Sequence, residues 1–179
     1  ELYYDLVGFG TAAFYVEAEP NGVRFACRHI AEICISENQD GRVDTVYRHF
    51  KMSARAIAMQ FAPTSLSAKI KKDVEDDPYK EHDLVHVVYP RGESGGKKAK
   101  DKPVASVYYT ADDRQLLSEG GFDEFPFMVT RFVKDSVSTY GRSPAMTALP
   151  DVKMLNKMSE TTIKAAQKQI DPPLMVPDD

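Results

Sequence analysis

The sequence contains no tryptophan and only two cysteines, Cys27 and Cys34, among its 179 residues. Two thiols in a chain of this length do not make a disulfide framework, so we expect both to be reduced, in a cytoplasmic setting. No apolar run approaches the roughly 20 residues that a membrane-spanning helix needs, and we find no signal peptide. The sequence therefore predicts a protein with no membrane partner.

A large excess of charge of one sign is also absent. The formal net charge is −4 at pH 7, while 28% of the residues are charged and 42% are hydrophobic. These fractions are ordinary for a soluble protein with a real core. A mildly negative chain is not typical of a protein whose main task is to grip phosphates.

Motifs for nucleotide or nucleophilic chemistry are missing. The segment 92–98 has glycines and lysines, but its spacing is too short for a phosphate-binding loop and no Ser or Thr follows the lysines. There is no Gly-x-Ser-x-Gly elbow and no cysteine in the context of a nucleophile. The acidic runs 73–77 and 112–113 are typical of solvated faces. We therefore predict that the chain is not an enzyme, with no catalytic residue and no cofactor.

Residues that could bind a metal do not have the right spacing. Cys27, His29 and Cys34 form one loose group, whereas structural zinc sites usually contain two close pairs. We interpret them as two buried thiols and a surface histidine. His82 and His86 are four apart on an expected strand, which separates them by about 13 Å. The sequence therefore predicts no metal site.

The order of the expected elements predicts an α+β fold with mostly antiparallel strands, two short inserted helices and one long C-terminal helix, because strands follow one another instead of alternating with helices. Strands 83–89 and 104–110 are expected to form a hairpin, and Gly120 and Gly121 a turn. The expected helices are the end of a helix at 1–7, closed by Gly8 and Gly10, and the helices 54–61, 66–75 and 144–170. The expected strands are 11–17, 23–28, 33–36, 43–50, 83–89, 104–110, 114–118 and 127–133.

The long helix has clear start and stop signals. Ser143 is a good N-cap, Pro144 suits the first helical position, and the Asp171-Pro172-Pro173 segment ends the helix. Pro150 predicts a kink, or a short first turn followed by a restart. Apolar residues recur at spacings of three and four, which places them on one narrow stripe. They are Met146, Leu149, Val152, Leu155, Met158, Thr162, Ile163, Ala166 and Ile170.

The two short helices leave a second interpretation open. Together, residues 54–75 are similar in outline to a helix-turn-helix, with Lys69, Lys71 and Lys72 on the second helix. Readout of base edges usually uses Arg, Asn or Gln. The alternative to DNA reading is a helical insertion that packs on the sheet.

The long helix and the residues before it carry a family resemblance. Segments 140–146, 148–153 and 155–158 (Tyr-Gly-Arg-Ser-Pro-Ala-Met, Ala-Leu-Pro-Asp-Val-Lys and Leu-Asn-Lys-Met) resemble the portal proteins, the head-to-tail connecting proteins of short-tailed phages. The resemblance extends to 28–48 and 122–127. It implies a wing-like α+β domain over 1–139, a stem helix over 140–171 and the start of the clip over 172–179. Because both ends look cut, we expect a fragment of a larger protein.

The resemblance also implies a function and partners. The whole protein would be a structural virion protein that forms a ring, usually of twelve copies, at one capsid vertex. Double-stranded DNA would pass through it, and the terminase large subunit, tail adaptors and capsid or scaffold proteins would dock on it. Assembly would take place in the host cytoplasm. The stripe of Val152, Leu155, Met158 and Ile163 would pack against other stem helices, and Lys157, Lys164 and Lys168 would face DNA or a neighbouring subunit. The competing hypothesis is a DNA-binding regulatory protein that uses the helix pair 54–75.

Overall fold

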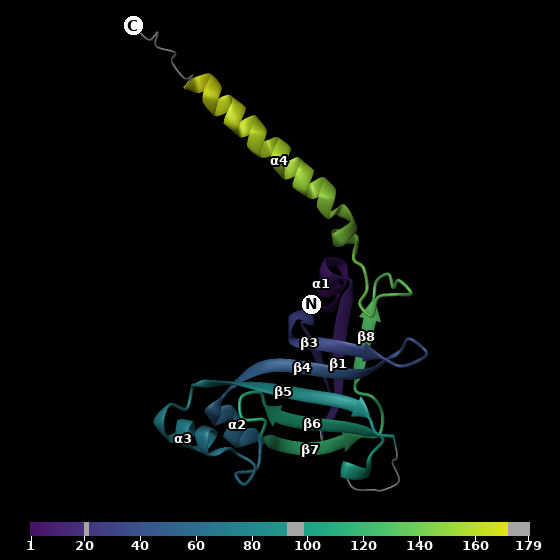
Figure 1. Cartoon of the computed structure of the whole chain (residues 1–179), viewed down its shortest axis with the longest axis vertical. Coiled ribbons are helices and arrows are strands. Elements are labelled where there is room, and N and C mark those ends of the chain that lie inside the picture. The colour runs from purple at the N-terminus through teal and green to yellow at the C-terminus, as the bar shows by residue number, and fades with distance from the viewer. Residues whose placement is uncertain (20–21, 93–98, 172–179) are drawn as a thin grey trace.

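A computed structural model describes residues 1–19, 22–92 and 99–171 of the chain (Figure 1). Segment 92–98, whose spacing is too short for a phosphate-binding loop, lies outside these residues except for Gly92, and the expected clip segment 172–179 lies wholly outside them. The helices are α1 (Leu2–Phe9), α2 (Ala54–Gln60), α3 (Ala68–Asp76) and α4 (Pro144–Ile170), with short 3₁₀ turns η1 (Ile30–Glu32) and η2 (Ala99–Asp101). The strands are β1 (Thr11–Glu19), β2 (Gly22–Arg28), β3 (Ile33–Glu37), β4 (Val43–Ser53), β5 (Glu81–Pro90), β6 (Val104–Thr110), β7 (Leu116–Phe122) and β8 (Phe127–Arg131).

The strands form two sheets, in the orders β2-β1-β8 and β3-β4-β5-β6-β7, and every pairing is antiparallel. The hairpin of β5 and β6 was predicted, and its register runs from Leu84 opposite Thr110 to Pro90 opposite Val104. The predicted α+β class, with mostly antiparallel strands and one long C-terminal helix, is confirmed.

Strand β7 corrects one sequence prediction. The turn is at 111–115 and the strand follows it, whereas the sequence suggested a strand at 114–118 and a turn at the two glycines. Arg114 takes a positive φ of 51°, and the N–H of Gln115 donates to the Thr110 hydroxyl at 3.0 Å. Gly120 and Gly121 pair with β6 in regular register. Glycine is tolerated there because β7 lies at the edge of its sheet.

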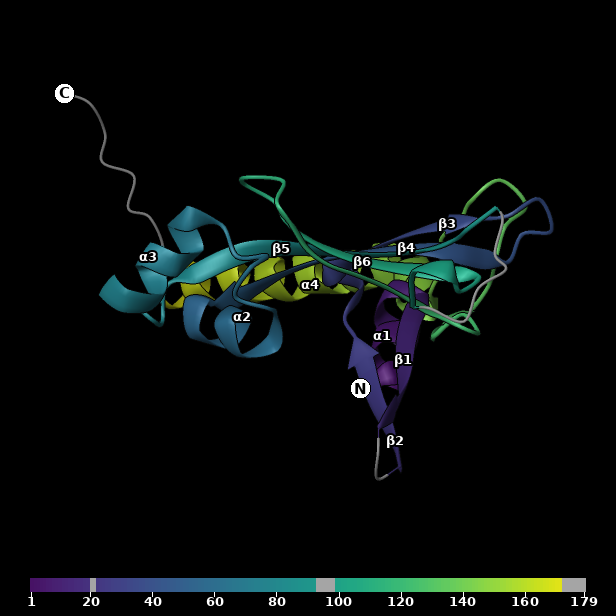
Figure 2. The same ribbon diagram turned by 90° about the horizontal axis from the view of Figure 1, so that it is seen from below.

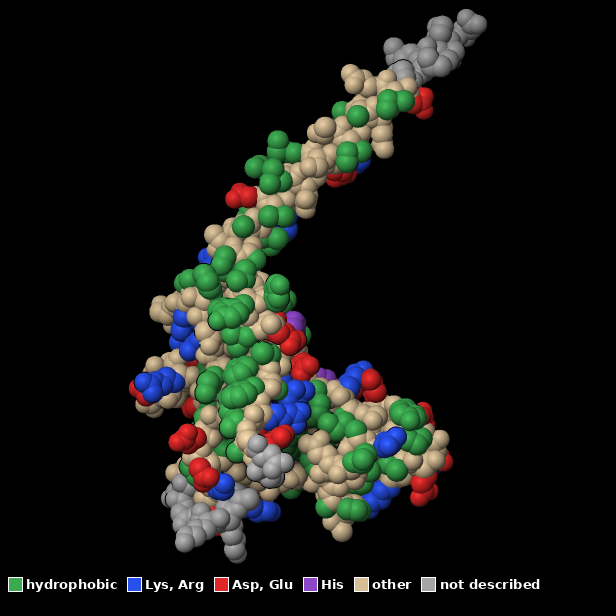
Figure 3. All heavy atoms as spheres, turned by 180° about the vertical axis from the view of Figure 1, so that it is seen from behind, with side chains coloured by type: hydrophobic (Ala, Val, Ile, Leu, Met, Phe, Trp, Pro, Cys, Tyr) green, Lys and Arg blue, Asp and Glu red, His purple; other side chains and the backbone are tan. Residues whose placement is uncertain are grey.

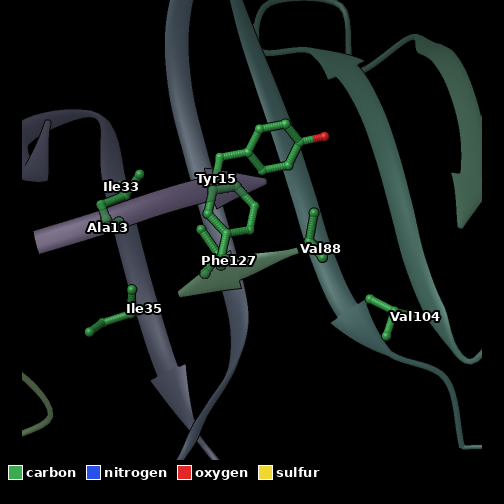
Figure 4. Packing of buried hydrophobic residues seen from close by; sticks show 8 residues of the cluster. Ala13, Tyr15, Ile33, Ile35, Val88, Val104 and Phe127 are labelled. Atoms are coloured by element: carbon green, nitrogen blue, oxygen red, sulfur yellow. The ribbon is translucent and has the colours of Figure 1, made fainter. Parts of the chain in front are cut away.

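The first core lies between the two sheets (Figure 4). Alternate residues of β1 and β8 point inward, so that the rings of Tyr15 and Phe127 pack at a tilt of 48° with their centres 4.9 Å apart. They pack on the same face of the large sheet as the fully buried Val46 and Val88. This packing joins strands near the N-terminus to strand β8, more than 100 residues later.

The second core lies farther along the same face of the large sheet. Val46 belongs to the first core and Phe50 to the second, and their separation of four keeps both on one side of β4. Helices α2 and α3 cover this end of the sheet with Ile57 and Ile70, which meet Leu84. The helix pair is therefore a helical insertion that packs on the sheet.

Helix α4 stands away from both cores (Figure 1). In the view from below it lies behind the large sheet (Figure 2). Only its base meets the body, next to α1. Within the described ranges, no helix is long and apolar enough to cross a membrane.

Candidate subunit interface

Helix α4 begins as its sequence predicts. The Ser143 hydroxyl accepts a hydrogen bond from the Met146 N–H at 2.9 Å, and Pro144 occupies the first turn. The helix then runs through Pro150 as one element to Ile170, so of the two alternatives predicted at Pro150 the restart is wrong, and the kink stays a prediction. A proline inside a helix removes one backbone hydrogen bond, but on an exposed helix water can satisfy the freed carbonyl group.

The base of α4 is held by a contact between two glycine backbones. Gly10, in the left-handed conformation with φ 77°, ends α1, and Gly141 lies directly against it. A Cβ on Gly10 would lie 2.5 Å from the Gly141 carbonyl oxygen, and a Cβ on Gly141 would overlap the Gly10 carbonyl oxygen. Only two residues without side chains fit this crossing.

Hydrogen bonds reinforce the crossing. The Gly141 N–H donates to the Thr11 hydroxyl at 2.8 Å, and the Ser143 hydroxyl donates to the Gly8 carbonyl at 2.9 Å. Thr11 and Ser143 are both fully buried. Ser143 therefore caps α4 and joins it to α1 with one side chain. Sequence reasoning assigned Ser143 the cap alone and missed the partner of Gly141, although the Tyr-Gly-Arg-Ser-Pro segment signalled that this position was special.

Side chains of the large sheet brace the segment before α4. The Ile35 N–H donates to the Tyr140 hydroxyl at 3.2 Å. The Glu37 carboxylate forms ion pairs with Arg131 and, at 2.8 Å, with Lys134. The direction in which α4 leaves the body is therefore fixed by contacts with both sheets and with α1.

Beyond its base, α4 buries none of its side chains. The predicted packing residues Val152, Leu155, Met158 and Ile163 are 47%, 60%, 59% and 59% exposed. Hydrophobic side chains are visible along the projecting helix (Figure 3). An apolar stripe on a helix of a folded chain normally faces a core or a partner. Here the body does not cover it, so the stripe is free to pack against another helix.

The opposite side of α4 is polar and mainly basic. At 100° per residue, Lys153, Lys157, Lys164 and Lys168 gather on the side of the helix away from Leu155. Glu160 lies among them and forms ion pairs with Lys157, at 3.0 Å, and with Lys164. Hydrogen bonds from Lys164 and Lys157 lower the pKa of Glu160. The structure thus places the three predicted lysines on one face and the four predicted packing residues on the other.

The candidate metal ligands are dispersed within the described part of the chain, where no group of three His, Cys, Asp or Glu residues could hold an ion. His82 lies 3.2 Å from Asp73, and His86 lies 2.9 Å from the Ser106 hydroxyl. The expectation of two buried thiols is wrong. Cys34 is exposed and Cys27 is half-buried, because Cys34 points to the face of β3 opposite its buried neighbours Ile33 and Ile35.

The helix pair uses its apolar residues, and one of its three lysines, in contacts within the chain. Ile57 and Ile70 hold α2 and α3 on the sheet, and Lys69 is bound to Asp112 at 2.7 Å. Lys71 and Lys72 remain exposed. One of the three lysines of the alternative hypothesis is thus paired with a carboxylate of the β6–β7 turn.

Comparison with known proteins places the chain among phage connectors. The profile of the family described as bacteriophage head to tail connecting protein matches residues 1–179. The portal protein of Salmonella phage epsilon15 is 31% identical over 183 residues, covering 98% of this chain and 33% of that protein. The probable portal protein of Bordetella phage BPP-1 is 29% identical over 182 residues, which cover 98% of this chain and 33% of that protein. The chain spans about a third of the length of these curated relatives. Because the family profile matches from the first residue to the last, the chain belongs to the bacteriophage head to tail connecting protein family.

Proposed function

We propose that this chain is part of the subunit of a portal ring at one capsid vertex, through which double-stranded DNA is packaged and ejected. One observation carries the proposal: α4 is a 27-residue helix with no buried residue, and it projects from a body that has its own two cores. A helix in a protein gains most of its stability by packing its apolar face against other elements. The stripe of α4 therefore requires a partner outside the chain's own body.

A ring of identical copies supplies such a partner. In a head-to-tail ring, each subunit presents the same two surfaces to its neighbours, and the rotation closes the assembly. Projecting helices that start at a fixed angle come together around the axis as a bundle. In this arrangement residues 1–139 form the wing, 140–171 the stem and 172–179 the start of the clip.

The basic face of α4 suits a channel for a sliding polyanion. Each phosphate that a lysine neutralises adds affinity through counterion release, so a channel must limit these contacts. Glu160 offsets part of the charge of Lys157 and Lys164. Lys157, Lys164 and Lys168 then face DNA, and Val152, Leu155, Met158 and Ile163 face neighbouring stem helices.

The wider assembly follows from a place at the capsid vertex. There the ring binds the terminase large subunit during packaging, the tail adaptors afterwards, and the capsid or scaffold proteins around it, first in the host cytoplasm and then in the virion. The protein acts by assembly and not by covalent chemistry.

The test uses the full-length protein, because this chain spans only about a third of the length of its relatives. Leu155→Asn with Met158→Asn removes the centre of the apolar stripe, and we expect the protein to lose its ring in sedimentation and negative-stain microscopy. The matched control, Lys157→Asn with Lys164→Asn, introduces two asparagines on the opposite face of α4. We expect this control to keep the ring. A monomeric wild-type protein, or a ring that survives the first pair, would refute the proposal.

A further inference from the structure

A small cavity lies in the seam between the two sheets. It has a volume of about 10 Å³, the room that one water-sized atom needs. Arg28 enters from β2 of the small sheet, and Arg48 enters from β4 of the large one. The six residues that line the cavity are Tyr15, Arg28, Arg48, His86, Tyr108 and Phe127.

Among the described residues, only one of the two arginines is paired with a carboxylate. The Nε of Arg48 lies 2.9 Å from Glu32, and its guanidinium carbon lies 4.0 Å from the centre of the Phe50 ring. Arg28 forms no ion pair with any carboxylate in the described ranges. Its guanidinium carbon lies 5.8 Å from the centre of the Tyr15 ring, which leaves its positive charge without a full partner.

The pKa values of two lining groups reflect burial first and the neighbouring arginine charges second, and Glu32 opposes part of the shift at Arg28. Burial lowers the pKa of Arg28, and the charge of Arg48 lowers it further. Burial, assisted by Arg48 and Arg28, lowers the pKa of His86 to about 3. The His86 ring stacks on Tyr108 at 3.9 Å and stays neutral. The site is therefore electropositive, and no lining residue supplies a negative charge.

We propose that this cavity binds one anionic atom, a halide ion or an oxygen of a small carboxylate, between the guanidinium groups of Arg28 and Arg48. Guanidinium groups are the usual partners of buried anions, because they are weakly hydrated and donate several hydrogen bonds. The bound atom bridges the small sheet and the large sheet. It therefore stabilises the packing of the two layers.

A larger cleft adjoins the cavity. A cleft of about 310 Å³ shares Tyr15 and Tyr108 with it and also meets Glu17, Phe61 and Gly121. Glu17 is the acidic group of this cleft, and it does not line the cavity itself. We place the entry of a small anion at these two shared tyrosines, and a large anion such as a nucleotide does not fit the inner space.

The location is tested by diffraction. Crystals of the chain soaked in sodium bromide should give an anomalous peak between the guanidinium groups of Arg28 and Arg48. A parallel soak in sodium acetate should place carboxylate density at the same point if the site accepts oxygen. Absence of both from the cavity, with bromide only elsewhere on the surface, overturns the proposal.

Binding in solution is tested by thermal unfolding at constant ionic strength, with fluoride as the strongly hydrated reference. Replacing fluoride with bromide or acetate should raise Tm by about 2–4 °C in a saturable way, once the anion exceeds about five times its Kd. A rise with bromide alone assigns the site to halides, and a rise with acetate alone assigns it to carboxylates. No rise with either anion overturns the proposal.

Two variants separate the site from general charge effects. Arg28→Gln should abolish the rise, while Arg24→Gln, which removes the same charge from the same face of β2 outside the cavity, should keep it. Equal loss in both variants overturns the proposal. If Arg28→Gln does not fold, the presence or absence of the bromide peak between Arg28 and Arg48 in the wild-type crystal decides whether the site exists.

Discussion

At the scale of single residues, the most demanding position is Gly141. Its neighbour across the crossing is the backbone of Gly10, which cannot move aside as a flexible side chain would. A Cβ there would also lie 2.9 Å from the Cβ of Arg131. The two glycines are 131 residues apart, and no local pattern in the sequence pairs them. Only the folded backbone reveals why both must lack a side chain.

We predict that Gly141→Ala lowers the free energy of unfolding by about 3 kcal/mol, because the added methyl group must displace backbone atoms. Urea denaturation followed by circular dichroism measures the change. Gly8→Ala is the control, since a Cβ at Gly8 meets nothing within 4 Å. Alanine inside α1 should be neutral or stabilising by about 0.5–1 kcal/mol. Equal stability of Gly141→Ala and the wild type would contradict the tight crossing.

His86 gives a prediction for pH. Its pKa is about 3 in the folded protein and 6.5 ordinarily, so between these values the unfolded chain binds a proton that the folded chain does not. Stability is therefore lost as pH falls from 6.5 towards 3, by about 1.4 kcal/mol per pH unit. His86→Gln should remove this part of the slope in unfolding measured from pH 6.5 to 4.

The control for the pH prediction is His49→Gln. His49 lies in the same strand as Arg48, but its side chain is 60% exposed and rests 3.3 Å from Asp83. Its replacement should leave most of the acid sensitivity in place. A His86→Gln variant with the wild-type slope would show that other groups cause the acid sensitivity.

At the scale of elements, the sequence predicted most helices and strands because their signals are local. Ser143 and Pro144 mark the start of α4, and alternating apolar residues mark β4 to β6. The prediction failed at β7, where glycines that usually form turns lie in a paired edge strand. It also failed for Cys34, because burial depends on which face of β3 meets the other sheet. The lysine and apolar faces of α4 followed from periodicity alone.

Pro150 provides a prediction for α4 itself. Proline in a helix interior costs about 3 kcal/mol relative to alanine, so Pro150→Ala should slow hydrogen exchange of the surrounding amides by roughly a hundredfold. Exchange read by mass spectrometry over 146–156 measures it. Pro144→Ala should have little effect, since proline is well suited to the first turn. Unchanged exchange in Pro150→Ala would mean that this part of α4 is limited by fraying of the helix and not by the proline.

At the scale of the whole molecule, the arrangement of two sheets and a projecting helix could not be predicted from the sequence. The seam between the sheets joins β1 and β8 to β4 and β5 through long-range contacts that no short window contains. The pairing of Arg28 with Arg48 across this seam was missed for the same reason. By contrast, the projection of α4 agrees with its narrow stripe, which offered too little apolar width for a core helix.

If the outer turns of α4 make no contact with the body, removing them should not change the stability of the body. We predict that a chain ending at residue 152, which keeps the glycine crossing and the first turns, retains its free energy of unfolding within about 0.5 kcal/mol. Denaturant unfolding followed by tyrosine fluorescence measures this, with the intact chain alongside. A loss of more than about 1 kcal/mol would mean that the outer turns of α4 pack on the body in solution.

The crossing of Gly10 and Gly141 has a consequence for any closed assembly. Atoms of the main chain meet there without a side chain between them, so no rotamer can change the angle at which α4 departs. In a closed circle of copies, a small angular error repeated at every step adds up until the last copy no longer meets the first. A joint with so little freedom keeps that error small. Gly10 and Gly141 would therefore limit how far the angle of α4 can differ from one copy to the next.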